Sequence, residues 1–460
     1  MNSTAYDYFV IIPRANDSQI LLLADQDGWT LPHFELAGHH ESSEVDKVNE
    51  AVRSLLGIEV TARRCLYFNF DPLIKHVSLL FLLENHSPDW LPPASARWTS
   101  RHELEGLKLS RPDQRIFLES FFAGNETEEL ARPCVPWARA GWFDEAAAWI
   151  KQELGRNKLE LVGPIEQRRN WFRSAILRVQ TDAGAAYFKA SPQMFRCEAA
   201  LTMLLAAECP ARMPRVLAAD PERNWLLMRD FGKTTLSEVE DVTLWEETLR
   251  AYAQIQIAYA ARVEEILRLG CPDLRLDKLA AQIDTILADP LLPLTGRQWR
   301  RLSASEVAEL RSLAPHLKRM CGRLKGYGVP ETLEHGDLHD RNIILNGRDF
   351  LYFDWSDACI THPFFGLSIF FRFQEMENCL PRVRERLRDA FLAGWARFGP
   401  TEYLIEAYEL AYRLAPLFHA LFYHRVILSQ LETAARWETD NMLPFWLRIL
   451  LREKQEILDF

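Results

Sequence analysis

Residues 335–342 read HGDLHDRN, and residues 354–357 read DWSD. The segment between them, residues 343–353, reads IILNGRDFLYF and consists of two short apolar runs separated by Asn346-Gly347. An Asn-Gly pair between two apolar runs is a strong signal for two antiparallel strands joined by a tight turn. The sequence therefore predicts a β-hairpin with a polar loop before it and an acidic segment after it.

This hairpin would bring oxygen-bearing side chains together at its open end. Asn342 enters the first strand and Asp354 leaves the second, so both can reach one metal ion, and oxygen is the ligand that Mg²⁺ prefers. Asp337, in the loop before Asn342, is placed to accept or orient the proton of an attacking hydroxyl group, as phosphoryl transfer requires. The alternative is a surface loop whose polar residues cap turns. A lone HGD would favour that alternative, but the full set favours phosphoryl transfer.

These motifs resemble those of the aminoglycoside phosphotransferase and choline kinase superfamily. Its catalytic loop reads HGDxHxxN, and its metal-binding carboxylate opens a DW or DF segment. The resemblance implies that Asp337 is the catalytic base, that Asn342 and Asp354 bind Mg²⁺, and that His335 and His339 brace the loop. It further implies an ATP- and Mg²⁺-dependent kinase that phosphorylates a hydroxyl group of a small molecule, either an antibiotic or a metabolite.

The resemblance covers roughly residues 156–460 and has one departure. Family members often have Asp-Leu a few residues after a Gly/His-Pro turn, where this chain has Gly366-Leu367. The aspartate that usually ties down the catalytic loop is therefore missing, and Asp357 and Asp340 are the candidates to replace it. The departure favours an alternative function, a pseudokinase that binds a nucleotide or metabolite as a sensor or scaffold. The intact catalytic-loop motif opposes that alternative.

A kinase of this kind also needs a lysine for the phosphates and a glutamate that pairs with it. Lys189 ends an apolar run after the Asp182-Ala183-Gly184 turn, although a lysine there could also protect an edge strand. Glu198 begins the next predicted helix, where the helix dipole alone also favours a glutamate. Ser174 lies in the expected nucleotide loop, which lacks glycine, and Met228 begins a segment that resembles the hinge that contacts adenine.

The first part of the chain has a mixed pattern. Apolar runs at 8–12 and 20–23, separated by Asn16-Asp17-Ser18, suggest a hairpin. Residues 43–56 carry apolar side chains at helical spacing, and Gly57 is placed to end that helix. We therefore expect a domain of both strands and helices.

This part resembles a Nudix domain in WTLP at 29–32, in LGIEV at 56–60 and in the segment 98–107. An active Nudix box reads REUXEE, whereas residues 50–55 read EAVRSL, so the metal-binding glutamates of the motif are gone. Hydrolysis of a diphosphate with a divalent metal needs clustered carboxylates. We therefore expect no hydrolase activity. Ligand binding, bracing of the kinase and formation of a homodimer are the open alternatives.

Together these patterns predict an α+β protein, a Nudix-like α/β domain followed by a bilobal protein-kinase-like fold. We place the Nudix-like domain at 1–125, and a linker with a connector helix at 126–155, because residues 123–136 are polar and contain two prolines. The small lobe is expected at 156–230, and the helical lobe at 231–460.

Composition narrows the function classes. The 460-residue chain has a formal net charge of −10, which does not suit a general nucleic-acid binder. Its eight cysteines form no CxxC pair, which favours reduced thiols over a disulfide framework or a zinc site. No signal peptide is visible, and the apolar runs are too short to cross a bilayer. We expect a cytoplasmic enzyme with ATP, Mg²⁺ and a small hydroxylated acceptor as its ligands, and neither a membrane nor a nucleic acid as a partner.

Overall fold

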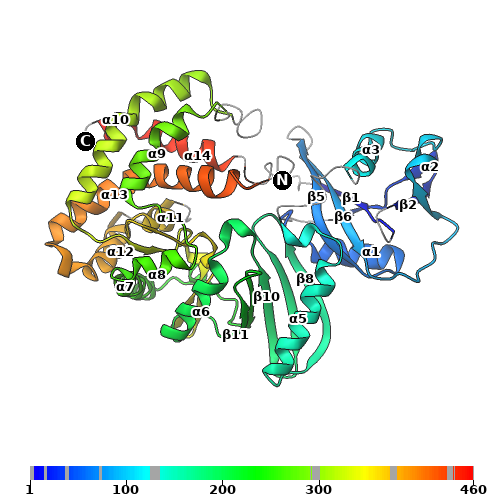
Figure 1. Ribbon diagram of the computed structural model, residues 1–460, viewed down its shortest axis with the longest axis horizontal. Helices are drawn as coiled ribbons and strands as arrows, with labels where there is room; N and C mark the ends of the chain where they lie inside the picture. Colours follow the sequence, from blue (N-terminus) through cyan, green and yellow to red (C-terminus); the bar gives the residue numbers. More distant parts are fainter. Residues whose placement is uncertain are drawn as a thin grey trace. The chain divides into compact units, whose positions relative to one another are not determined.

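The computed structural model describes residues 5–14, 18–36, 41–71, 75–124, 135–290, 292, 301–372, 381–431, 439 and 441–458. The chain divides into two compact units, Met1–Pro192 and Gln193–Phe460 (Figure 1). No helix in the described ranges has both the length and the apolar character needed to cross a membrane.

The first unit begins with a mixed β and α domain. Its strands are β1 (Ala5–Ile11), β2 (Gln19–Asp25), β3 (Gly28–Thr30), β4 (His33–Leu36), β5 (Val60–Asp71), β6 (His76–Asn85) and β7 (Ala96–Ser100). Its helices are α1 (Asp46–Leu56), α2 (Arg101–Glu105) and α3 (Gln114–Gly124). The strands form a four-stranded sheet in the order β4-β1-β6-β5, with β1 and β6 parallel, and an antiparallel sheet in the order β3-β2-β7.

Strand β6 explains how this domain packs. Successive side chains of a strand point to opposite faces of its sheet, so an apolar run can supply two cores. Leu79 and Phe81 join the cluster that includes Val48 of α1, whereas Leu80 and Leu82 join the cluster that contains residues of α2 and α3. The four-stranded sheet is therefore covered by apolar side chains on both faces.

The expected hairpin between residues 8–12 and 20–23 is confirmed only at its closed end, where Pro13 bridges Ile20, Arg14 N donates to Gln19 O (2.8 Å) and Leu21 N donates to Ile12 O (3.0 Å). Asn16 and Asp17 of the expected turn lie outside the described residues. Beyond these contacts the runs separate, because β1 pairs with β4 and β6 whereas β2 pairs with β3 and β7. The predicted helix over 43–56 is confirmed as α1, and Gly57 ends it in a left-handed conformation (φ 70°).

The rest of the first unit consists of a short 3₁₀ turn, η2 (Pro136–Ala138), the helix α5 (Trp142–Arg156), and the antiparallel strands β8 (Leu161–Asn170), β9 (Ala175–Thr181) and β10 (Gly184–Ala190). Helix α5 lies where the sequence predicted a connector helix, within residues 126–155. Trp142 and Trp149 of α5 both pack against Phe188 of β10. This aromatic contact fixes the helix against the strands.

Polar side chains of β8 join these strands to the amino-terminal domain within the first unit. Strand β5 is at the edge of its sheet and carries a register shift after Ala62. The side chain of Gln167 donates from Nε2 to Ala62 O (2.8 Å) and accepts from Ala62 N at Oε1 (2.7 Å). Asn49 of α1 donates to the same Oε1 (3.1 Å), and Asn170 Nδ2 also donates to Ala62 O. Gln167 therefore satisfies an edge-strand peptide that another strand would otherwise pair.

The second unit is mainly helical. Its helices are α6 (Glu198–Glu208), α7 (Val242–Tyr259), α8 (Val263–Arg268), α9 (Leu276–Ala288), α10 (Ala304–Gly326), α11 (Gly366–Arg372), α12 (Pro381–Ala393), α13 (Thr401–Phe422), α14 (Met442–Arg452) and α15 (Lys454–Leu458). Short 3₁₀ turns lie at Gln193–Phe195, Leu236–Glu238 (η4), Asp340–Asn342 (η7), Trp355–Asp357 (η8) and Ala396–Phe398, and a π-helical segment at Tyr423–Leu428.

Three short antiparallel strand pairs lie among these helices. They are β11 (Val216–Asp220) with β12 (Trp225–Arg229), β13 (Thr332–Glu334) with β16 (Cys359–Thr361), and β14 (Ile343–Asn346) with β15 (Asp349–Tyr352). The last pair is the hairpin that the sequence predicted. No pattern in the sequence predicted the pair β13 and β16, whose strands have three residues each.

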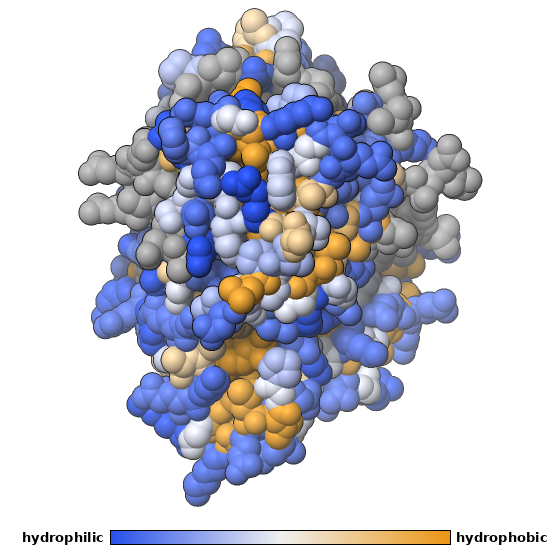
Figure 2. Space-filling model, turned by 90° about the vertical axis from the view of Figure 1, so that its right-hand side faces the viewer, coloured by the Kyte–Doolittle hydropathy of each residue, from blue (hydrophilic) through white to orange (hydrophobic). Residues whose placement is uncertain are grey.

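The surface seen in Figure 2 is mostly hydrophilic, and apolar residues gather on it in limited groups. In the first unit, the most exposed large apolar side chains are Leu91 (83%) and Ile116 (70%). Single exposed apolar residues are normal on folded proteins.

We predict that Gln167→Ala lowers the stability of the protein, because Ala62 N–H and Asn49 Nδ2 would lose a buried acceptor, whereas Ala62 C=O would keep Asn170 as a donor. Each unsatisfied buried polar group costs about 1–3 kcal/mol. Thermal unfolding should begin at a lower temperature in this variant than in Gln180→Ala, a control on the neighbouring strand β9 with a half-buried side chain. Equal melting temperatures in the two variants would contradict this role of Gln167.

Candidate active site

The catalytic-loop motif lies between β13 and the hairpin β14–β15, and its backbone is held from several sides. His335 is completely buried, and its Nε2 lies 2.9 Å from Phe353 O. Its Nδ1 accepts a hydrogen bond from Asp337 N (3.3 Å), so Nε2 carries the proton and donates to Phe353. Burial lowers the pKa of His335 to about 4, so the ring is neutral near pH 7. A buried neutral imidazole thus bridges the loop and the end of the hairpin.

Gly336 is required by its surroundings. Its φ is 79°, in the left-handed region that favours glycine. A Cβ at this position would meet the carbonyl oxygen of Asp357, and would lie 2.8 Å from the carbonyl carbon of that residue. The close approach of the two backbones brings Asp357 beside the catalytic loop.

Asp337 and His339 are the more accessible members of the motif. The Asp337 side chain is 36% exposed, and its Oδ2 lies 3.8 Å from His339 Nε2. His339 accepts from Arg341 N at Nδ1 (3.1 Å) and so caps the turn η7. The completely buried Leu338 lies between them and anchors the loop in the core. An accessible carboxylate on a firmly held backbone is what a general base requires.

The hairpin brings Asn342 next to the residue before Asp354. Ile343 pairs with Tyr352 in register, and Phe353 N donates to Asn342 O (3.2 Å). Asn342 is buried, and its Nδ2 donates to Asp337 O (2.9 Å). The expected hairpin is thereby confirmed, and the amide of Asn342 connects it to the loop.

Asp354 has an unusual backbone conformation, with φ 64° and ψ 60°. Few residues other than glycine adopt this left-handed region, and such residues cluster at functional sites. The Asp354 Oδ1 accepts from the hydroxyl of Ser356 (2.9 Å). The conformation turns the chain sharply from β15 into η8 and places the carboxylate at the end of the hairpin.

The donor set at this end fits magnesium. Within the described ranges, no group of three or more His, Cys, Asp or Glu residues is arranged to hold a metal ion. Mg²⁺, however, is commonly bound by one or two protein oxygens together with phosphates and water. An asparagine oxygen and one carboxylate, as in Asn342 and Asp354, match that pattern.

A hollow of about 280 Å³ lies in front of the catalytic loop within the second unit. One wall consists of loop residues and Asp357 (Gly336, Asp337, His339, Asp340, Arg341, Asp357). The other wall is mostly aromatic and comes from α11, α13, the π-helical segment and α14 (Ile369, His419, Phe422, Tyr423, Met442, Trp446). Burial lowers the pKa of His419, which stacks on Trp446 at 4.3 Å between ring centroids, to about 3. The hollow therefore combines acidic groups with neutral rings.

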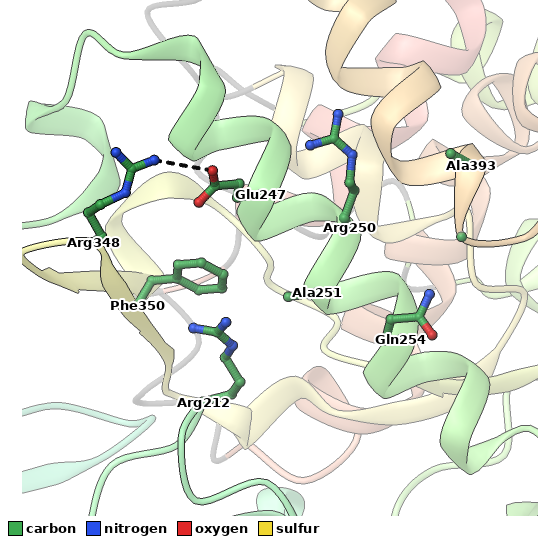
Figure 3. Close-up of a pocket in the computed structure, with 9 residues that line it drawn as sticks. Arg212, Glu247, Arg250, Ala251, Gln254, Arg348, Phe350 and Ala393 are labelled. Atoms are coloured by element: carbon green, nitrogen blue, oxygen red, sulfur yellow. Dashed lines mark hydrogen bonds and ion pairs between the residues drawn. The ribbon is translucent and has the colours of Figure 1, made fainter.

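Figure 3 shows a second hollow, of about 470 Å³, that is lined by α7, Arg212, Phe350 of β15 and Arg348 in the turn before it. The guanidinium group of Arg212 stacks on Phe350 at 3.9 Å, and Arg348 pairs with Glu247 (3.4 Å). None of the sequence-predicted site residues lines this hollow. The smaller hollow is therefore the candidate acceptor site.

The four residues predicted to bind the nucleotide are divided between the units. Lys189 is buried on β10, and Ser174 is buried before β9, where its hydroxyl accepts from Trp171 Nε1 (3.2 Å); both belong to the first unit. Glu198 is buried at the start of α6 and Met228 is on β12, both in the second unit. Their roles in nucleotide binding remain predictions.

The residue that sequence reasoning missed is Glu334, immediately before the motif. It is completely buried, and its Oε1 accepts from His335 N (2.9 Å) and Gly336 N (3.4 Å). A glutamate at the end of a three-residue strand has no distinctive sequence pattern. The available signal in the sequence was Gly366, where family members often have aspartate; in the structure Gly366 lies against Glu334.

A model of the phosphotransferase enzyme (APH) family matches residues 166–401, slightly more than half of the chain. The chain belongs to this family. The match does not include residues 1–165, which have no family assigned. No match was found among curated proteins.

Several solved structures are similar to this phosphotransferase-family protein. Choline kinase LicA from Streptococcus pneumoniae has 13% identity and a TM-score of 0.45, covering 69% of this chain and 100% of its own. Choline kinase from Cryptosporidium parvum Iowa II has 11% identity and a TM-score of 0.47, with 69% and 96% covered. Macrolide 2′-phosphotransferase MphH from Brachybacterium faecium has 13% identity and a TM-score of 0.43, with 65% and 98% covered. At these values, neither a substrate nor a residue role is transferred.

We predict that Gly336→Ala lowers the melting temperature of the protein far more than Gly347→Ala does. Both glycines have positive φ (79° and 66°), so alanine strains the backbone at each. Only at Gly336 would the new Cβ also meet the Asp357 backbone; nothing lies within 4 Å of one at Gly347. The two melting temperatures give the comparison. Equal losses would show that backbone strain alone makes Gly336 necessary.

Proposed function

We propose that the protein transfers the γ-phosphate of ATP to a hydroxyl group of a small molecule in a Mg²⁺-dependent reaction. The observation that carries this proposal is the hydrogen bond from Asn342 Nδ2 to Asp337 O (2.9 Å). It joins the residue proposed as the base to a residue proposed as a metal ligand. Because the nitrogen of the amide is used by the loop, its oxygen is the atom suited to a cation.

In this proposal each group of the site has one task. Asp337 faces the hollow and orients the acceptor hydroxyl, accepting its proton as the phosphoryl group is transferred. His335 and His339 keep the loop in place through the contacts described above. Asn342 and Asp354 would hold Mg²⁺, which when bound neutralises charge on the phosphates. Lys189, with Glu198 as its partner, is proposed to contact the phosphates. Ser174 and Met228 are proposed to contact the nucleotide.

The hollow indicates the chemical class of the acceptor. Asp337, Asp340 and Asp357 contribute acidic groups, against the single guanidinium group of Arg341. The rings of Tyr423 and Trp446, with others, supply a flat apolar wall that also favours cations. We therefore propose a hydroxylated acceptor, an antibiotic or a metabolite, with an apolar or cationic part rather than an anionic one. A nucleotide-binding pseudokinase, the alternative function, would bind ATP without turning it over.

The N-terminal part, residues 1–125, is proposed to be a degenerate Nudix-like domain without hydrolase activity. The mixed sheet and helix α1 support this assignment. Helix α1 carries two carboxylates, Asp46 and Glu50, and Asp46 forms an ion pair with Arg168 (3.1 Å). Ser54 and Leu55, on the exposed side of the helix with Glu50, supply none, so α1 lacks the carboxylate cluster that metal-assisted hydrolysis of a diphosphate needs.

We predict that Asp337→Asn lowers the turnover of ATP with an accepted alcohol by about 100-fold or more, because general-base catalysis contributes roughly that factor. Steady-state assays with Mg²⁺ and a library of small hydroxylated compounds would measure the effect. Asp349→Asn, at an exposed position of the hairpin, is the matched control and should keep wild-type turnover. Near-normal turnover in Asp337→Asn would refute the assignment of the base.

A separate assay tests the amino-terminal domain. The full-length Asp337→Asn variant should hydrolyse no nucleoside diphosphate derivative in the presence of Mg²⁺, because α1 lacks the carboxylates needed. Product release can be followed by chromatography. Hydrolysis that is lost on introducing Glu50→Gln would show that the domain is an active hydrolase.

A further inference from the structure

The carboxyl group of Glu334 is surrounded by hydrogen-bond donors. Its Oε1 accepts from Tyr252 OH (2.6 Å), and its Oε2 accepts from Gln256 Nε2 (2.9 Å). The backbone N–H groups of His335 and Gly336 donate to Oε1, and that of Gly366 also donates to the carboxyl group. Every one of these partners is a neutral N–H or O–H group. A carboxylate, which only accepts, is the one side-chain group that can receive all of them.

These donors come from distant parts of the second unit. Tyr252 and Gln256 are one turn apart on α7, and Gly366 is the first residue of α11. Tyr252 OH in turn accepts from His335 N (2.9 Å), and Gln256 Nε2 also donates to Pro363 O (3.1 Å). The Glu334 carboxyl group therefore connects the first two residues of the catalytic loop to two helices.

Gly366 leaves the space that this carboxyl group fills. A Cβ at position 366 would meet Glu334 Oε1, and would lie 2.7 Å from its Cδ and 2.8 Å from its Oε2. Gly366 is also buried. A side chain at 366 and the carboxyl group of Glu334 therefore cannot both occupy this place without a rearrangement.

Burial of the Glu334 carboxyl group lowers the stability of the folded protein near neutral pH. It raises the pKa of this carboxyl group from its ordinary value of 4.5 to about 7. A raised pKa means that the folded state binds the proton more tightly than the unfolded chain does. The contribution of this group to stability therefore falls as the pH rises from about 4.5 to 7. A group that costs stability near neutral pH is more readily explained by what it positions than by what it stabilises.

We propose that Glu334 is the positioning residue of the catalytic loop, and that it replaces a carboxylate which would otherwise come from position 366. The sequence had suggested Asp357 or Asp340 for this task. Asp340 and Asp357 line the hollow, whereas Glu334 is completely buried and accepts hydrogen bonds from the backbone N–H groups of the loop. The loss of an aspartate at 366 is then compensated, and Gly366 is no sign of an inactive protein. This inference rests on the proposed phosphotransferase function.

An exchange of the two positions tests the proposal. Glu334→Ala should lower kcat by about 10- to 100-fold with a smaller change in KM for ATP, because a misplaced loop affects the reacting groups more than nucleotide binding. Gly366→Asp alone should also be impaired, because two carboxyl groups would compete for one buried place. The double variant Glu334→Ala/Gly366→Asp returns one carboxylate to that place. It should recover most of the lost kcat.

Glu331→Gln is the matched control. Glu331 is half-buried three residues earlier and accepts from Leu276 N, so it also ties a backbone N–H, but one outside the loop. This variant should keep wild-type kcat. A double variant no better than the worse single variant would overturn the proposal, as would wild-type kcat in Glu334→Ala.

Hydrogen exchange separates failure of this proposal from failure of the proposed function. In the full-length protein, the amide of Gly336 should exchange at least about tenfold faster in Glu334→Ala than in the wild type or Glu331→Gln, because it loses its acceptor, whereas the amide of His335 keeps Tyr252 OH as an acceptor. The double variant should restore the protection of Gly336. If the wild-type protein does not turn over ATP, the phosphotransferase proposal fails and exchange still decides the role of Glu334. Unchanged protection in Glu334→Ala would refute it.

Discussion

The peptide backbone of Phe353 is hydrogen-bonded on both sides, and the site depends on this arrangement. Its N–H donates to Asn342 O, which closes the end of the β14–β15 hairpin, and its C=O accepts from His335 Nε2. One residue thus fixes the hairpin relative to the catalytic loop. The next residue, Asp354, then leaves the strand in a left-handed conformation, which determines where its carboxylate lies. Because Phe353 is bonded to both segments and directly precedes Asp354, a small shift of Phe353 would move the base and both proposed metal ligands together.

Burial determines the protonation state of His335, on which its contacts with the loop and the hairpin depend. His335 can accept from Asp337 N and donate to Phe353 O only as a neutral ring, and burial lowers its pKa to about 4. Glu334 is buried in the same core but is surrounded by donors instead. The two adjacent side chains therefore hold the loop by complementary means. One bridges the loop to the hairpin, and the other ties it to α7 and α11.

In the first unit, the main constraint is the edge of the four-stranded sheet at β5. The family match begins at residue 166, inside β8, and the side chain of Gln167 in that strand pairs the outward-facing peptide of Ala62 in β5. A strand that opens the family region thereby also completes the sheet that precedes it. An unpaired edge would be a template for association with other chains. The amino-terminal domain is thus connected to the family region by buried hydrogen bonds in addition to the chain itself.

Local signals in the sequence determined the hairpin at 343–352, the helix α1 with its end at Gly57, and the catalytic loop motif, because each depends on neighbours in the chain. Turn residues, helical spacing and a fixed motif are readable without knowledge of the fold. The pairing of β1 with β4 and β6, and not with β2, was decided by tertiary structure. The partners of a central strand depend on which side chains the fold buries on the two faces of the sheet, and this is not visible in the local sequence. The same holds for Glu334. The missing aspartate at 366 was visible in the sequence, but its replacement was not, because the carboxyl group reaches the loop through a fold that brings β13, α7 and α11 together.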